Sequence, residues 1–230
     1  MVNTMIYDQK TINILNNLIK KYPERFKDAC NSLNDNQQKS KYWLVEKLNE
    51  YKFDFRDKTS EKGIDALVLA GWYGVLAYIL IEEFKLQKIN SIDTLDYDPL
   101  AKNVGRILFA PKDAENLKSG RATFVNYKYK DIRKLKYDYL NKFALVTCTS
   151  CEHLNQKDID HVVDRLHSDT LVVLQSNNYK DCNQHINISE DINEFRNRYT
   201  DKLDNVRAYV KPFVSYDRYM VIGTRRKKNV

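Results

Sequence analysis

Cysteine is scarce in this chain, and several features that mark particular protein classes are missing. Four cysteines among 230 residues do not suggest a disulfide framework, so we expect a reduced, intracellular setting. No stretch approaches 18 uninterrupted apolar residues, which argues against a membrane-spanning helix. The first ten residues, MVNTMIYDQK, lack the basic-then-apolar layout of a secretory signal. We therefore expect a cytoplasmic protein without a membrane partner.

The composition is that of a folded, basic domain. With 43% apolar residues the chain is too apolar to be disordered, and 230 residues suffice for one large core. The net charge of +7 favours partners that carry phosphate. The chain is also rich in Asn, Lys, Ile and Tyr, which an AT-rich coding sequence over-produces, and this accounts for part of the lysine excess. The basic run 225–228 is interpreted as a solvated tail.

The spacing of apolar residues divides the chain into two parts. Residues 1–61 show helical spacing and predict a helical N-terminal extension or lid. Residues 62–230 alternate strand-like and helix-like segments and predict one α/β domain, in which runs such as ALVT and LVVL are apolar on both faces. Two successive strands close the chain and predict a hairpin. The expected strands are 66–70, 91–96, 122–127, 144–149, 170–176, 206–210 and 219–224, and the expected helices between them are 75–84, 100–108, 156–166 and 189–199.

A glycine-containing turn follows the first expected strand. In DALVLAGWYG, two glycines bracket Trp72 and Tyr73, and a segment with the pattern of an amphipathic helix follows. Glycine lets a backbone approach a ligand and the start of a helix offers free N–H groups, so such a turn favours a nucleotide site. Asp96, 22 residues after Gly74, ends the second strand, where a carboxylate can accept two hydrogen bonds from ribose hydroxyls. The alternative is a plain tight connection, with Asp96 and Asp98 as ordinary strand-end and cap residues.

The order of elements over residues 62–224, together with AGWYG and LDYDP, resembles the class I S-adenosylmethionine-dependent methyltransferases. The resemblance implies a seven-stranded, mostly parallel sheet of order 3-2-1-4-5-7-6 with an antiparallel C-terminal hairpin and helices on both faces. Trp72 and Tyr73 depart from the family, which more often has a second glycine-x-glycine step here. The cofactor contacts implied by the resemblance are Ala70, Gly71, Trp72, Tyr73 and Gly74 for the methionine part, Asp96 for the ribose, Asp131 for the adenine amino group and Thr149 in the loop after strand four.

The fourth expected strand ends in VTCTSCEHL, the densest polar cluster of the chain. In the resembling family this loop faces the transferred methyl group, so Glu152 or His153 is a candidate general base, and Ser150 and Cys151 are candidate substrate contacts. The segment departs from the NPPY-type motif of many amine-methylating members, which argues against an exocyclic amine as acceptor. The alternative is an N-cap cluster for the following helix, with His153 at the surface.

Polar residues also follow the fifth expected strand. Gln175, Asn177 and Asn178 can hydrogen-bond a planar polar group, and Tyr179 can stack on it; any solvent-facing loop would also contain such residues. The ends of strands four and five lie together in a parallel sheet.

This proximity raises a zinc hypothesis, because Cys148, Cys151, Cys182 and His185 form two pairs of ligand spacing. No metal is included in the favoured interpretation, since neither pair has a glycine-bearing knuckle. In the final hairpin, Tyr216, Arg218 and Tyr219 are interpreted as strand-pairing residues with a solvent-facing charge.

The favoured hypothesis is a methyltransferase that uses S-adenosylmethionine, with a nucleic acid or nucleotide as acceptor slightly preferred to a small molecule or protein because of the charge. One alternative is an NAD-dependent α/β enzyme, which the absent GxGxxG turn and the terminal hairpin disfavour. Another is a non-catalytic protein that keeps this fold for binding or assembly. The sequence does not identify the acceptor or the oligomeric state.

Overall fold

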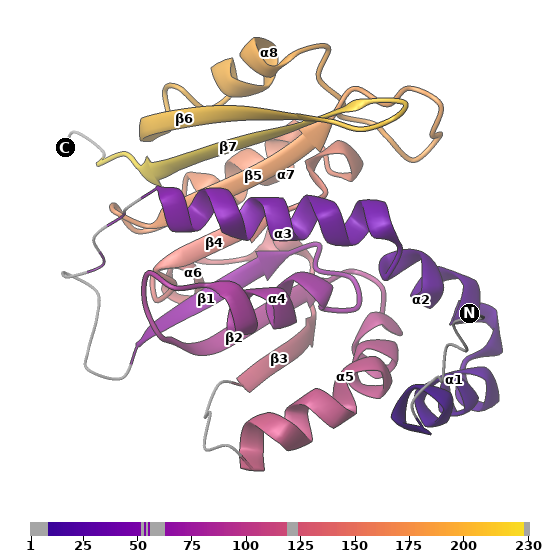
Figure 1. Cartoon of the computed structure of the whole chain (residues 1–230). Helices are drawn as coiled ribbons and strands as arrows, with labels where there is room; N and C mark the ends of the chain where they lie inside the picture. Colours follow the sequence, from indigo (N-terminus) through magenta and orange to yellow (C-terminus); the bar gives the residue numbers. More distant parts are fainter. Residues whose placement is uncertain (1–8, 52, 54, 56–62, 119–123, 228–230) are drawn as a thin grey trace, which may run out of the picture.

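A twisted sheet of seven strands crosses the computed structural model, which describes residues 9–51, 53, 55, 63–118 and 124–227 (Figure 1). The strand order is β3-β2-β1-β4-β5-β7-β6, with β7 antiparallel to both β5 and β6 and the other neighbours parallel. The predicted fold class and strand order are therefore confirmed. The strands are β1 (Ile64–Leu69), β2 (Ile89–Asp96), β3 (Phe124–Tyr129), β4 (Leu145–Cys148), β5 (Leu171–Asn177), β6 (Leu203–Pro212) and β7 (Asp217–Arg225).

Burial along the strands follows their position in the sheet. Every residue of β4 and β5 is buried, as the apolar runs ALVT and LVVL predict for strands covered on both faces. The edge strand β3 alternates between exposed and more buried positions, and so does β6 at the opposite edge.

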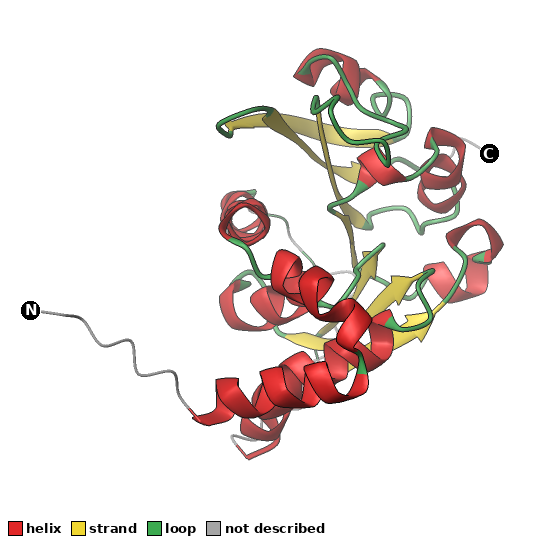
Figure 2. Cartoon of the chain, turned by 90° about the vertical axis from the view of Figure 1, so that its right-hand side faces the viewer, coloured by secondary structure: helices red, strands yellow, loops and turns green. Residues whose placement is uncertain are grey.

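Helices cover both faces of the sheet (Figures 1 and 2). Helices α3, α4 and α5 contribute to one apolar cluster, and α6, α7 and α8 to a second cluster on the other face. The helices are α1 (Gln9–Lys21), α2 (Phe26–Ser32), α3 (Asp35–Glu50), α4 (Val75–Glu83), α5 (Ala101–Lys118), α6 (Tyr137–Leu140), α7 (Gln156–Val163) and α8 (Ile192–Asn197), with 3-10 turns η1 (Pro23–Arg25), η2 (Ile132–Lys134) and η3 (Cys151–His153). Within the described ranges no helix has the length and apolarity needed to cross a membrane.

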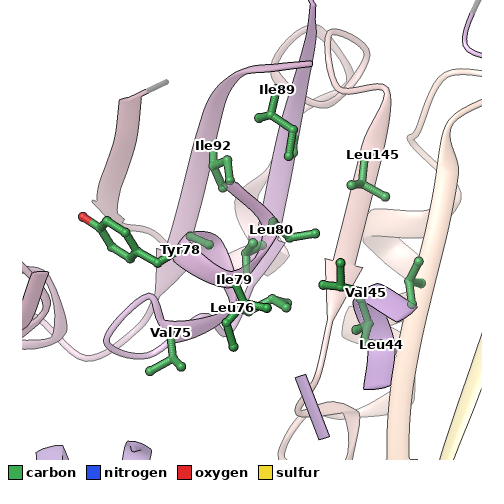
Figure 3. Close-up of a cluster of buried hydrophobic side chains, with 14 of the residues drawn as sticks. Leu44, Val45, Val75, Leu76, Tyr78, Ile79, Leu80, Ile89, Ile92 and Leu145 are labelled. Carbon is green, nitrogen blue, oxygen red and sulfur yellow. The ribbon is translucent and has the colours of Figure 1, made fainter. Parts of the chain in front are cut away.

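The first cluster is centred on α4, whose residues from Val75 to Leu80 are all buried. Figure 3 shows Leu76 and Leu80 between strand residues such as Ile92 and the α3 residue Leu44. Because α3 is packed into this cluster, the end of the predicted N-terminal extension is built into the helical layer. Helix α1 packs on α5, and its buried Leu18 belongs to the same cluster. The predicted boundary at 61/62 lies partly outside the described residues.

Two elements differ from their predicted bounds for identifiable reasons. Helix α5 continues past the predicted residue 108 and through Pro111, since contacts from other helices hold its second half: Tyr78 Oη donates to Asp113 Oδ1 (2.7 Å) and Lys10 Nζ pairs with Glu115 (2.8 Å). Strand β6 begins earlier than the predicted residue 206, because a bulge near Asp204 lets the chain pair with β7 on both sides of it. Residues 122 and 123 of the third predicted strand are outside the described ranges.

Candidate functional site

The turn after β1 contains three left-handed residues in alternation. Ala70, Trp72 and Gly74 have φ of 47°, 47° and 86°. Glycine adopts such angles freely, whereas an alanine or a tryptophan there costs about 1–2 kcal/mol. Gly71 is needed for a different reason, because a Cβ atom at this position would lie 2.0 Å from Thr94 Oγ1 on β2. The turn thus keeps a glycine-like path with non-glycine residues at two of its positions.

The two aromatic residues of this turn have different surroundings: Trp72 lines a cavity, whereas Tyr73 is part of the core. The rings of Trp72 and Tyr73 stack with their centroids 4.7 Å apart. Tyr73 is fully buried, and its carbonyl accepts a hydrogen bond from Tyr127 Oη (3.2 Å). Gly74 caps α4 without a side chain, so the start of this helix is left without a side-chain cap.

Asp96, at the end of β2, is joined directly to this turn. Its Oδ2 accepts from the Trp72 N–H (2.8 Å) and its Oδ1 from the Asp98 N–H (2.9 Å). Each oxygen keeps a second lone pair. Burial raises the pKa of the Asp96 carboxyl, and the backbone hydrogen bonds oppose this rise. Asp98 accepts from the Leu100 N–H (2.9 Å) ahead of α5, as predicted for a cap, and also pairs with Arg25 (3.0 Å).

A cavity of about 570 Å³ opens beside Asp96, at the carboxyl ends of β1, β2 and β4. This volume is in the range of pockets for drug-sized ligands. The structure brings eight of the predicted site residues to its wall. They are Ala70, Trp72, Asp96, Asp131, Thr149, Ser150, Glu152 and His153.

A smaller chamber of about 30 Å³ shares part of this wall and reaches under α3. Gly71 and Tyr73 line it, and so does Lys41. Lys41 Nζ donates to Gln37 Oε1 (2.6 Å). Burial, with a further contribution from the positive charge of Arg218, lowers the pKa of Lys41 to about 7.

Asp131, the predicted adenine contact, is paired within its own loop after β3. Arg133 binds it in bidentate fashion, with Nε 2.9 Å from Oδ1 and Nη2 2.8 Å from Oδ2. This guanidinium holds the pKa of Asp131 at about 2. Both side chains line the cavity, so the carboxylate reaches a ligand only alongside its arginine.

Glu152, the first candidate base, is held by a buried network. Its Oε1 accepts from Arg218 Nη1 (2.7 Å) and Asn177 Nδ2 (2.9 Å), while Oε2 has no partner among the described residues. Arg218 Nη2 also donates to the Thr149 carbonyl. Only 3% of Glu152 and 5% of Arg218 are exposed. The interpretation of Arg218 as a solvent-facing charge is therefore wrong: β7 pairs with β5, which points its guanidinium at the loop after β4.

His153, the second candidate base, lies on the cavity wall beside a second histidine. The rings of His153 and His185 meet edge to face, 4.7 Å between centroids. His153 Nδ1 lies 3.1 Å from the Gln184 carbonyl, and His185 Nδ1 lies 2.8 Å from the Tyr179 carbonyl. Desolvation lowers the pKa of His153.

The predicted contacts at the end of β5 and in the following loop do not all lie at one place. Asn177 joins the network of Glu152, and its Oδ1 accepts from the Tyr179 N–H (2.9 Å). Gln175 is fully buried outside both cavities, where its Oε1 accepts from Ser40 Oγ (2.9 Å) and ties α3 to β5. Asn178 accepts from the Asp217 N–H (2.8 Å) at the start of β7. Among these four residues, Asn177 contacts Glu152 directly, while Tyr179 contacts His185.

The four residues of the zinc hypothesis do not gather into one group among the described residues. Cys148 and Cys151 are both buried, and burial raises the pKa of the Cys151 thiol. His185 instead groups with Glu152 and His153. Cys151 is also absent from the walls of both cavities.

Sequence reasoning missed Lys41 and Arg218 as parts of this site. Lys41 lies on the side of α3 that holds Leu44 and Leu48, and a lysine on an apolar helical face is a signal that was available. Arg218 had no such signal, because its neighbours in β7 only indicate a strand.

No family model and no curated protein match the sequence. Solved structures do match in fold. N-methyltransferase NodS from Bradyrhizobium japonicum WM9 aligns with a TM-score of 0.57 and 12% identity over 84% of this chain and 99% of that chain. The N-terminal domain of EvdMO1 with SAH bound gives 0.55 and 12% over 81% of each chain. The plantazolicin methyltransferase BpumL, in complex with SAH, gives 0.54 and 10% over 94% of this chain and 96% of that chain.

These similarities define the fold of the chain as that of the class I S-adenosylmethionine-dependent methyltransferases. The resemblance read from AGWYG, LDYDP and the order of elements is thereby confirmed at the level of the fold. At identities of 10–12%, the shared architecture does not carry activity or substrate from these proteins to this chain.

Proposed function

We propose that this protein is an S-adenosylmethionine-dependent methyltransferase. The observation that carries the proposal is the direct hydrogen bond from the Trp72 N–H to Asp96 Oδ2, at the wall of the 570 Å³ cavity. This hydrogen bond holds the glycine turn against the carboxylate at the end of β2, at the sheet edge where open α/β sheets bind ligands. The binding of SAH by proteins of the same fold supports this cofactor.

The residues on the cavity wall fit the parts of this cofactor. The left-handed turn from Ala70 to Gly74 brings backbone to the methionine end, and the remaining lone pairs of Asp96 suit the ribose hydroxyls. The loop with Asp131 lines the same cavity and would contact the adenine. When bound, the cofactor supplies a reactive methyl group on a positively charged sulfur. The protein then has to orient an acceptor beside Thr149, Ser150 and His153 and exclude water.

For the acceptor we propose a nucleotide or a nucleic acid. The net charge of +7 supports this class, as do Lys130 and Arg133 on the cavity wall. Tyr97 and Tyr129 are exposed next to this wall, with ring centroids 5.7 Å apart, and such a pair offers a stacking surface. Labelled methyl transfer into DNA, RNA, protein and small-molecule fractions tests this assignment, and label confined to protein or to small molecules other than nucleotides would overturn it.

Calorimetric titration with S-adenosylmethionine and SAH tests the cofactor. We expect binding by the native protein and at least a tenfold weaker affinity in Asp96→Ala, because the variant loses the acceptor of the ribose hydrogen bonds, worth about 1.4 kcal/mol or more. Asp201→Ala, an exposed aspartate next to β6, is the matched control and should bind as the native protein does. Absence of heat and of a thermal shift with both compounds would contradict the proposal.

The alternative of a non-catalytic binding protein predicts a different combination of results. It requires retained binding of SAH with no labelled methyl transferred to any fraction. An NAD-dependent reaction receives no support from the turn, since Leu69 stands where GxGxxG has its first glycine.

A further inference from the structure

Three potential metal ligands meet where β4 and β5 end. Glu152 and His153 lie in η3 after β4, and His185 lies in the loop after β5. One ligand atom from each residue lies within 4.8 Å of the others, and no second group of this kind is present among the described residues. His153 and His185 are 32 positions apart in the chain, and they lie close together because β4 and β5 are adjacent parallel strands that end at the same edge of the sheet.

Both histidine rings have a backbone partner on Nδ1. Each Nδ1 faces a backbone carbonyl, that of Gln184 for His153 (3.1 Å) and that of Tyr179 for His185 (2.8 Å). A carbonyl only accepts, so each Nδ1 carries the hydrogen and the neutral ring keeps its lone pair on Nε2. Metal-ligating histidines have this arrangement, because the carbonyl fixes the ring and its tautomer.

The Glu152 carboxylate is a second indication that a cation binds here, independent of the histidines. Arg218 and Asn177 both bind Oε1 of Glu152, while Oε2 is buried and without a hydrogen-bond partner in the described structure. Only 4% of the Glu152 side chain is exposed. An unpartnered buried carboxylate oxygen costs free energy, and a cation bound to it removes that cost.

We propose that Glu152, His153 and His185 bind one divalent transition-metal ion. Two imidazole nitrogens and one carboxylate oxygen suit zinc, iron, cobalt or manganese better than magnesium or calcium, which prefer oxygen ligands. Three protein ligands leave coordination positions open. Because Glu152 and His153 line the 570 Å³ cavity, those positions face the space where an acceptor would lie.

The role of such an ion in the reaction rests on the proposed methyltransferase function. An ion at this place lowers the pKa of an acceptor hydroxyl, whose O–H bond breaks with release of the proton to solvent. The oxygen then forms its bond to the methyl carbon, the bond from that carbon to the sulfonium sulfur breaks, and its electron pair stays on sulfur to give SAH. The acceptor class is thereby narrowed to a hydroxyl group.

Tag-free full-length protein, stripped with a chelator and titrated with Co²⁺ and Zn²⁺, tests the site. We expect one ion per chain, visible cobalt absorption bands, and an affinity at least about tenfold lower in His185→Gln and in His153→Gln. His161→Gln, a histidine on α7 outside the group, and Cys182→Ser are the controls and should bind as the native protein does. Circular dichroism confirms that each variant is folded.

Three results would overturn the metal site: no stoichiometric binding by the native protein, unchanged affinity in both histidine variants, or a thiolate-to-cobalt charge-transfer band, which would place the ion on the cysteines. Titration with SAH in the presence and absence of metal separates this proposal from the previous one. Metal binding without any SAH binding would support the metal site and contradict the methyltransferase proposal. SAH binding without any metal binding would support the methyltransferase proposal and contradict the metal site.

Discussion

The two halves of the cavity wall are built by different means. At the ends of β1 and β2, the backbone forms the site: N–H groups of Trp72 and Asp98 hold Asp96. At the ends of β4 and β5, side chains form it, through the buried pair of Glu152 and Arg218. The first half depends on where the chain can bend, and the second on charges that neutralise one another away from water. Mutations should therefore affect the two halves in different ways.

The largest effect is expected where side chains form the wall. Arg218→Met leaves the Glu152 carboxylate buried without its cation, and we expect the free energy of unfolding to fall by about 3–5 kcal/mol. Urea denaturation at neutral pH measures this. Arg226→Met is the control, since its exposed pair with Asp204 should contribute about 1 kcal/mol or less.

Adding Glu152→Gln to Arg218→Met should restore part of the stability, because no uncompensated charge then remains buried. A double variant as unstable as Arg218→Met alone would show that packing, and not charge, holds this half together.

In the backbone-built half, a single methyl group should have a slightly smaller effect. Gly71→Ala places a Cβ 2.0 Å from Thr94 Oγ1, and we expect a loss of stability of about 1–3 kcal/mol together with weaker SAH binding. Removing the opposing hydroxyl in Gly71→Ala/Thr94→Ala should recover much of it. Equal stability of Gly71→Ala and native protein in urea denaturation would refute the close approach of the turn to β2.

The smallest of these effects concerns Lys41, which lies between the two halves and lines the small chamber. Its pKa is lowered from 10.5 to about 7, so between these pH values the unfolded chain binds the proton that the folded chain releases. Stability should therefore rise as the pH increases from 7 towards 10, and fully protonated Lys41 should destabilise the fold below pH 7.

Lys41→Met removes this dependence. We expect the variant to exceed the native protein in stability at pH 7, and to do so by a smaller margin at pH 9.5, in urea denaturation at both pH values. Lys39→Met changes an exposed lysine of the same helix and should behave as the native protein at both. A difference that does not shrink with pH would contradict the lowered pKa.

The half that the backbone builds could be predicted from the sequence. The alternation of strands and helices predicted an α/β sheet, in which short apolar runs such as LVVL fit strands covered on both faces. The strand order was implied by the resemblance to the class I methyltransferases. AGWYG and Asp96 are close in sequence and follow adjacent strands, so their meeting follows from the topology. The end of α5 was missed because Pro111 normally breaks a helix, whereas here contacts from other elements, such as those of Tyr78 and Lys10, hold the helix beyond it.

The half built from side chains could be predicted only in part. The loop with Glu152 and His153 was identified as a polar cluster at a strand end, but the partner of Glu152 lies 66 positions away on β7. Which way Arg218 points depends on the register of β7 against β5, which the sequence does not specify. His185 was considered with cysteines of matching spacing, whereas the fold places it beside His153.

The left-handed path through Ala70, Trp72 and Gly74 has a consequence for how such sites are recognised. The physical feature of the turn is its three alternating positive φ angles, and glycine is only the residue that most often adopts them. A pattern that requires those letters passes over this chain, while one expressed in backbone angles would find it. A turn of this conformation can therefore occur in a chain that lacks the usual glycine pattern, provided that a stacked ring pair or a buried strand supports the bend.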